Sequence, residues 1–216
     1  MDVHWSGFFY GCNFLLTKYF FIALEYCPLC RILGRSLSSY LLFSFISPPV
    51  KKSKTLRDLL LQKLMALYDV ELRIIKALPG MAKKASDPEL RAAFTSHLQE
   101  TYGQVERLEH CFKLLKTKPK KLPAQAIRGL AEDTDWVVKH VAKGPALDAN
   151  LIAAAQYVEH YEIAGYGTAR EWASLMGHAD VADLLHQTLS EEVMADETLS
   201  DLAEAKINNA VEMGVA

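Results

Sequence analysis

After residue 51 the sequence shows no sign of β-structure, and the chain has no excess of one charge. Neither strand-like alternation nor a dipeptide typical of a hairpin turn occurs in residues 52–216, which argues against a sheet protein. Lys and Arg number 24 against 26 Asp and Glu in the whole chain. This near balance argues against a nucleic-acid-binding protein that relies on bulk positive charge.

Cysteine is also scarce, with four residues in 216, and three of them lie within the first fifty. Nothing in this usage requires an oxidising compartment, so we expect a cytoplasmic protein. The pair Cys27 and Cys30 has the CxxC spacing of thiol redox and zinc sites, but it is a weak signal because no second pair accompanies it. Cys111 lies on an apolar helix face and is predicted to be a small buried hydrophobic residue.

Residues 1–50 are hydrophobic and poor in charge, and they differ in composition from residues 51–216, which we predict to form the folded domain. The uncharged runs of this extension are shorter than the roughly 20 residues that a membrane span needs. It also lacks the basic region of a secretory signal. Three interpretations stay open: upstream sequence translated from a start site assigned too early, with Val50 as the true initiator; a membrane-associated segment; or an addition of unknown role.

Residues 51–216 are predicted to form four long helices and one short helix. Apolar residues recur at helical spacing in residues 55–78, 86–116, 148–176 and 180–208. Pro79-Gly80 is expected to end the first helix. A shorter helix over 124–141, packed through residues that include Trp136, fills the long connection between the second and third helices. This order predicts an all-α, ferritin-like up-down four-helix bundle with one long crossover that carries a short extra helix.

Each long helix carries an acidic residue on its apolar face, and the third helix carries two, Glu159 and Glu162. These two are three residues apart, so they share one side of the helix. Burying an ionised carboxylate costs several kcal/mol unless something pairs with it, and a bound cation turns mutual repulsion into attraction. Glu71, Glu100 or Glu192 alone would most simply be a boundary residue that reaches water. Four helices that each place one at mid-height favour a metal site.

The turn at Gly177 allows two of these positions to be aligned. Glu162 lies 15 residues before Gly177 and Glu192 lies 15 residues after it, so antiparallel helices should bring the two carboxylates level. Counted from the turn at residues 79–88, Glu71 comes level with about His97, and Glu100 lies about one turn further along. Such a cluster of carboxylates is an oxygen-rich site suited to two divalent ions, iron or manganese.

Four segments together resemble the YciE/YciF family of ferritin-like proteins. They are KTLRDLLLQKLMALYDVELRIIKALPGMA, HLQETYGQVERLEHCF, AAAQYVEHYEIAGYGTAR and LLHQTLSEEVMADETLSDLAE. The resemblance spans about residues 54–205 and leaves residues 1–50 without a counterpart. It implies a dimeric ferritin-like bundle with a dinuclear metal centre and a stress-associated role. By position, it implies the metal ligands Glu71, Glu100, Glu159, Glu162 and Glu192.

The chain departs from the Glu-x-x-His pattern that ferritin-like sites use on two helices. Gly103 follows Glu100 at the third position, and Ala195 follows Glu192 in the same way. His97, Gln104 and Asp196 are the available substitutes, so nitrogen ligation stays open and an oxygen-rich site is plausible. His160 points about 100° away from Glu159 on the helix, and we expect it in the core or in support of the ligands.

Two functional hypotheses follow. In the first, the protein binds two iron or manganese ions and turns over dioxygen or peroxide in an oxidase- or peroxidase-type activity. Tyr68, Tyr157, Tyr161 and Tyr166 are then candidate oxidisable side chains, although packing is the simpler role for each. In the second, it is a non-catalytic, stress-induced structural or oligomerising bundle. Residues 209–216 offer no further helix for cage building, so the expected partner is a second copy of the chain. No nucleic acid is expected, and membrane contact is expected only through residues 1–50.

Overall fold

The computed structural model describes residues 53–214, and within this range the chain forms helices and no strand. The predictions for residues 1–50, including the Cys27–Cys30 pair and the division into an extension and a folded domain, fall outside the described residues. No helix within residues 53–214 combines the length and the apolar character that crossing a membrane requires.

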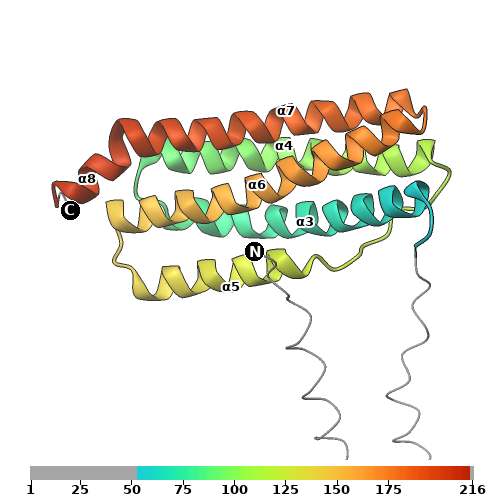
Figure 1. The fold of residues 1–216 in the computed structure, drawn as a ribbon. Helices are drawn as coiled ribbons and strands as arrows, with labels where there is room; N and C mark the ends of the chain where they lie inside the picture. The colour runs from blue at the N-terminus through green and yellow to red at the C-terminus, as the bar shows by residue number, and fades with distance from the viewer. Residues whose placement is uncertain (1–52, 215–216) are drawn as a thin grey trace, which may run out of the picture. The chain divides into compact units, whose positions relative to one another are not determined.

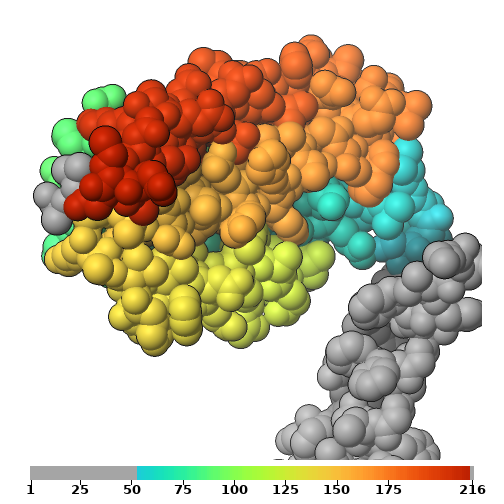
Figure 2. Space-filling view, turned by 60° about the vertical axis from the view of Figure 1, so that its left-hand side comes forward, coloured from blue at the N-terminus to red at the C-terminus, as the bar shows by residue number. Residues whose placement is uncertain are grey.

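Four long helices lie side by side and form the bundle (Figure 1). They are α3 (Leu56–Lys84), α4 (Pro88–Leu114), α6 (Pro145–Leu175) and α7 (Ala179–Leu202). The connection from α4 to α6 carries the short helix α5 (Gln125–His140), which packs along α6 as a ridge (Figure 2). The chain continues after α7 into a π-helical turn, η1 (Ala203–Ile207), and the short α8 (Asn208–Glu212). The predicted bundle with one long crossover is confirmed.

Local sequence signals fix where the helices begin. Thr55 and Asp58 form a capping box at the start of α3, in which each side chain accepts a hydrogen bond from the backbone of the other. Asp87 caps α4 by accepting from the backbone amides of its first turn, and Pro88 follows at the first helical position, where its missing N–H costs nothing. The turn between α6 and α7 uses Gly177 at φ +75°, a conformation that glycine adopts without steric cost.

Three local expectations are wrong. Helix α3 does not stop at Pro79 but runs through it to Lys84, because Leu78 is buried and Met81 packs on the same apolar cluster, which holds the last turn in place. Trp136 of α5 is 59 % exposed and stacks on His140 rather than packing in the core. The last residues are not helix-free, since α8 extends to Glu212.

The core consists of two apolar clusters separated by a polar layer at mid-height. One cluster gathers the C-terminal part of α3, the start of α4, the start of α6 and the end of α7. The other gathers the opposite halves of the same four helices. Between them, every long helix contributes buried polar residues. These are Glu71, His97, Thr101, Gln104, Glu159, Glu162, Thr188 and Glu192.

Helices α3 and α6 approach each other closely beside this layer because α6 has a glycine at position 165. A Cβ atom at Gly165 would lie 2.8 Å from Cδ2 of the buried Leu67 on α3. At Gly167 the nearest neighbour of such an atom, Leu189 Cδ2, is 4.0 Å away. The close contact between helices therefore depends on Gly165 and not on Gly167.

Candidate metal centre

The polar layer places four glutamates in the middle of the bundle. Glu71, Glu162 and Glu192 are fully buried, and Glu159 is 3 % exposed. They come from three helices, α3, α6 and α7, and we refer to these four residues as the central glutamates. Each lies between apolar residues of the two core clusters on its own helix, so packing above and below holds it inward.

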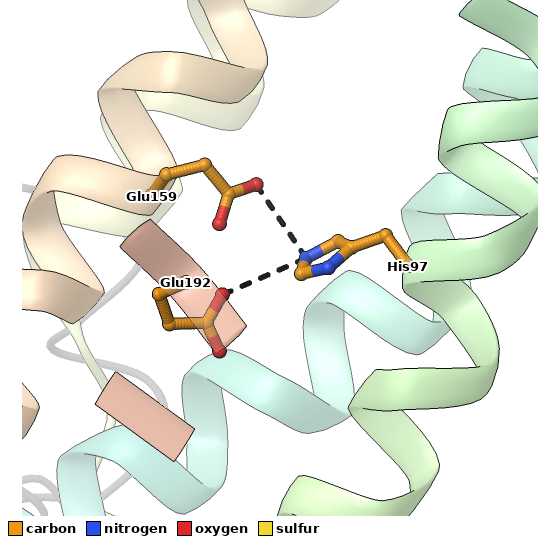
Figure 3. Close-up of side chains that lie close together, drawn as sticks. All are labelled: His97, Glu159 and Glu192. Atoms are coloured by element: carbon orange, nitrogen blue, oxygen red, sulfur yellow. Dashed lines mark ion pairs between the residues drawn. The ribbon is translucent and has the colours of Figure 1, made fainter. Parts of the chain in front are cut away.

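The central glutamates and His97 form two groups of potential ligands. In the first, ligand atoms of Glu71, Glu162 and Glu192 all lie within 4.8 Å of one another; in the second, those of His97, Glu159 and Glu192 do so. Figure 3 shows the second group, with the imidazole of His97 on α4 directed between the two carboxylates. Its Nε2 lies 3.5 Å from Oε1 of Glu159 and 3.9 Å from Oε2 of Glu192. Glu192 belongs to both groups and links them.

Most polar atoms of these groups have no hydrogen-bond partner within residues 53–214. Both carboxylate oxygens of Glu162 and both of Glu192 are buried and unpartnered, as are Oε2 of Glu71, Oε2 of Glu159 and Nε2 of His97. A buried polar atom without a partner is costly, so native structures satisfy almost all of them. Carboxylate oxygens that converge without donors are suited to a cation. The residues present therefore fit one or more metal ions.

The electrostatics of the layer support the same interpretation. Burial, followed by the charges of neighbouring carboxylates, raises the pKa of Glu162 and Glu192 well above the usual range. Burial is also the main cause that raises the pKa of Glu159, and it raises the pKa of Glu71 to about 7. Burial alone would lower the pKa of His97, but the hydrogen bond with Glu100 and the charges of Glu159 and Glu71 outweigh it and raise the pKa. The layer thus favours bound positive charge, as protons or as metal ions.

Among the tyrosines of residues 53–214, Tyr166 is the one whose hydroxyl joins the layer. It is fully buried on α6, one turn after Glu162, and its hydroxyl donates a hydrogen bond to Oε1 of Glu71. Packing was the simpler prediction for each tyrosine, and it misses this contact. Its signal in the sequence is the spacing of four residues from Glu162, which puts both side chains on one helix face. Tyr166 fixes the orientation of the Glu71 carboxylate.

Glu100, Gln104 and Asp196 lie outside the two ligand groups. The Glu100 side chain is 44 % exposed and accepts from Nδ1 of His97 at 3.4 Å, so its predicted role as a ligand remains a prediction. Gln104 is buried and donates to Glu191, which Arg107 also binds. Asp196 accepts from Gln156 and lies 3.5 Å from His160. Since the His160 side chain is 66 % exposed, its expected place in the core is wrong.

The structure brings together four of the five predicted ligands and adds His97, which the sequence offered only as a substitute. Its signal was the reversed spacing His97-x-x-Glu100, which lets the carboxylate bind one ring nitrogen and leaves the other for the interior. The alignment about Gly177 is confirmed for Glu162 and Glu192, which share one ligand group. Glu106, on the same helix as His97, is exposed.

Comparison with known proteins yields a family and several relatives. Residues 55–212 match the family described as Domain of unknown function (DUF892). The chain is 39 % identical over 160 residues to Protein YciF of Escherichia coli (strain K12), covering 74 % of this chain and 96 % of that protein.

Solved structures agree with this result. The crystal structure of the E. coli stress protein YciF matches with a TM-score of 0.69, covering 72 % of this chain and 99 % of that one. YcfI from Rhodopseudomonas palustris is 42 % identical, with a TM-score of 0.68 over 70 % of this chain and 96 % of that one. A protein from Xanthomonas campestris pv. campestris, 21 % identical, has a TM-score of 0.59 over 75 % of this chain and its whole length, and shows the fold alone.

Proposed function

The chain belongs to the DUF892 family, and we propose that it binds a dinuclear centre of two divalent ions, iron or manganese, in the middle of its bundle. The observation that carries this proposal is the convergence of unpartnered, fully buried carboxylate oxygens from Glu71, Glu162 and Glu192. The two groups of potential ligands share Glu192, and each would hold one of the two ions. The stress-associated role is proposed by analogy with YciF of E. coli, which is a stress protein.

The residues around the proposed centre would have different roles in binding the ions. The central glutamates would supply oxygen ligands and cancel the charge of the ions, while His97 would supply one nitrogen, Nε2. Glu100 binds the other ring nitrogen of His97 and so orients the imidazole. Tyr166 orients Glu71, and the two apolar clusters close the layer at both ends along the bundle axis. This donor set, rich in carboxylates with one imidazole, suits iron or manganese.

We further propose activity toward dioxygen or peroxide, for which two bound iron ions would supply the electrons. The buried phenol of Tyr166 lies next to Glu71 and can hold or give up a proton at its hydroxyl oxygen. Burial, followed by the charges of Glu71 and Glu162, raises the pKa of Tyr166 well above its usual range, so the phenol is protonated in the resting state.

Metal content measured on purified variants tests the site. Glu162→Ala is expected to lose most of the bound iron or manganese after reconstitution, because the central carboxylate is removed. Glu106→Ala is the matched control, since Glu106 is an exposed glutamate on α4. Equal metal content in the two variants would refute the assignment. For the redox activity, an absorbance change of the iron-loaded protein on addition of oxygen or peroxide is expected, and its absence would remove that part of the proposal.

A non-catalytic, oligomerising bundle is the second candidate function, and large apolar side chains on the surface favour it. Trp136 is 59 % exposed and Tyr157 is 62 % exposed, and aromatic residues are enriched at interfaces between proteins. We propose that the chain forms a homodimer and acts in the cytoplasm, where a free thiol such as that of buried Cys111 is the rule. Sedimentation equilibrium tests the dimer, and a monomer at micromolar concentration would contradict it.

A further inference from the structure

A cavity of about 200 Å³ opens on the surface between α4 and α7 and extends to the candidate centre. His97 and Glu159 line it, although their side chains are only 8 % and 4 % exposed. Each has a buried polar atom without a hydrogen-bond partner in the described part of the chain, Nε2 of His97 and Oε2 of Glu159. The cavity therefore leads from the surface to two residues of the candidate centre, each of which holds an unpartnered polar atom that is itself buried.

The cavity reaches one ligand group and not the other. His97 and Glu159 belong to the group that it touches, whereas Glu71 and Glu162 of the other group do not line it and are fully buried. The two groups meet only at Glu192. We call the group of His97, Glu159 and Glu192 the open group, and the group of Glu71, Glu162 and Glu192 the closed group.

Two further carboxylates line the cavity, and they differ in their partners. Glu191 is bound by both terminal nitrogens of the Arg107 guanidinium, so its charge is already cancelled. Glu100 is 44 % exposed, and it shares a 3.4 Å contact with Nδ1 of His97 while lying open to solvent. Glu100 is thus the carboxylate that an ion arriving from solvent would meet first.

The size of the cavity and the residues of its wall indicate what kind of ligand can occupy it. A volume of about 200 Å³ has room for a divalent ion with several of its waters, at about 30 Å³ for each water. Ala93 and Ala195 are among the small residues that form the wall. Three of the polar side chains that line the cavity, Glu100, Glu159 and Glu191, are carboxylates, and they lie beside the hydroxyls of Ser96 and Thr198. This acidic lining favours a cation over an anion.

We propose that this cavity is the path by which hydrated divalent cations enter the bundle, with Glu100 as their first ligand and the open group as their first destination. The closed group then fills through the open group, since Glu192 is common to both. This inference rests on the proposed metal centre and adds three points: the side of the bundle from which the ion enters, the first residue that binds it, and the order in which the two ligand groups are filled.

Narrowing the cavity tests the path. In stopped-flow mixing of the metal-free full-length protein with Co²⁺, followed by its visible absorption, Ala93→Phe is expected to slow uptake at least about tenfold, because the ion must wait for a local opening of the bundle. The final amount of bound Co²⁺ should match that of the wild type. Ala92→Phe is the matched control, because Ala92 is the exposed neighbour on the same helix and does not line the cavity. Equal uptake rates in these two variants would overturn the path.

Removing the first ligand provides a second variant that leaves the packing intact. Glu100→Gln is expected to slow Co²⁺ uptake about tenfold at low salt, with a smaller effect at high salt, because steering by an exposed charge is screened. Glu106→Gln, which removes an exposed charge from the same helix, should load at the wild-type rate. Loading of Glu100→Gln at the rate of Glu106→Gln would overturn the role of Glu100.

Failure of the path can be distinguished from failure of the metal centre. If the wild type takes up no Co²⁺, the proposed function fails and this inference fails with it. Modification of His97 by diethyl pyrocarbonate gives a readout without metal: the wild type and Ala92→Phe should react at His97, whereas Ala93→Phe should be protected at least about tenfold. If His97 reacts equally in all three proteins, the cavity does not control access.

Discussion

Two sets of buried carboxylates in this protein differ in how they are satisfied. Asp148 is 2 % exposed, and its two oxygens accept from the backbone amides of Ser86 and Asp87, each at 2.8 Å. Asp69 is 7 % exposed and accepts from the Arg73 side chain and from the backbone amide at the start of α5. These two carboxylates join segments of the fold, and each finds its donors within the protein.

The central glutamates are buried as deeply but have few donors. Within residues 53–214, the Tyr166 hydroxyl donates a hydrogen bond to Glu71, and His97 lies near Glu159. Otherwise the groups closest to each central glutamate are the other central glutamates. Depth of burial therefore does not distinguish a structural carboxylate from a ligand, whereas the set of donors does. Packing of the apolar clusters holds the central glutamates in place, and a bound cation would supply the partner that the described residues do not.

The largest expected difference between the two sets is in the pH dependence of stability. A Glu with a raised folded-state pKa contributes stability that is complete below the unfolded pKa and lost as the pH rises through the folded pKa. For Glu71 this window runs from 4.5 to about 7, a loss of roughly 3 kcal/mol. The other central glutamates and His97, with raised pKa values, act in the same direction.

The metal-free protein is thus expected to be more stable at about pH 5 than at about pH 8, measured by urea unfolding. Asp69 contributes with the opposite sign. Its interactions with Arg73 and with the Ala124 amide outweigh burial and lower its pKa, so its contribution is present above 3.8 and lost as the pH falls through the folded value. A metal-free protein whose stability rises steadily from pH 5 to pH 8 would contradict the contrast.

Removing Asp148 should produce a large loss of stability that metal does not alter. Asp148→Ala leaves the amides of Ser86 and Asp87 without their acceptor, which costs about 1.5–3 kcal/mol for hydrogen bonds to a charged group. Urea unfolding with and without Mn²⁺ measures this, and the two losses should agree. A loss that appears only in the metal-loaded protein would mean that Asp148 belongs functionally with the central glutamates.

Replacing a central glutamate should have the opposite effect in the absence of metal. Glu162→Gln removes a buried carboxylate that has no donor, so the metal-free protein at about pH 8 should gain about 1–2 kcal/mol of stability. With metal present the same change should destabilise the protein relative to the wild type. Thermal melts in chelator and in Mn²⁺ test this reversal of sign, and a destabilised metal-free variant would mean that Glu162 has a structural partner.

The smallest expected effect concerns the close approach that brings Glu162 next to Glu71. Gly167→Ala should raise stability by up to about 1 kcal/mol, the difference between the two residues within a helix. Gly165→Ala should lose that gain, because its Cβ would push on Leu67 of α3. Melting temperatures of the two variants measure the difference. Equal values would mean that the contact between α3 and α6 is not tight.

Much of this fold could be predicted from the sequence because its signals are local. Apolar spacing predicted the helices, and counting residues from Gly177 placed Glu162 level with Glu192. The end of α3 could not be predicted, because packing of Leu78 and Met81 outweighs the local effect of Pro79. Local helix propensity describes α3 in isolation, whereas packing against the apolar cluster stabilises its last turn.

Only part of the candidate site could be predicted from the sequence, for a similar reason. Each inward-facing carboxylate could be identified on its own helix, but the rotation of a helix about its axis depends on its neighbours. That rotation brings His97 into contact with Glu159 and leaves Glu100 at the mouth of the cavity. It also turns His160 to solvent, where it lies beside Asp196. Such choices follow from tertiary packing rather than from spacing along one helix.

The most direct test of the account is the melting temperature of the chelator-treated protein at about pH 8, with and without added Mn²⁺ or anaerobic Fe²⁺. Binding to the folded state alone at 100 times the dissociation constant adds about 2.7 kcal/mol. For a domain of this size that is a rise of roughly 5–11 °C. We predict such a rise in the wild type and its loss in Glu162→Ala. Identical melting temperatures of the wild type with and without these ions would contradict the claim that the central glutamates form a metal site.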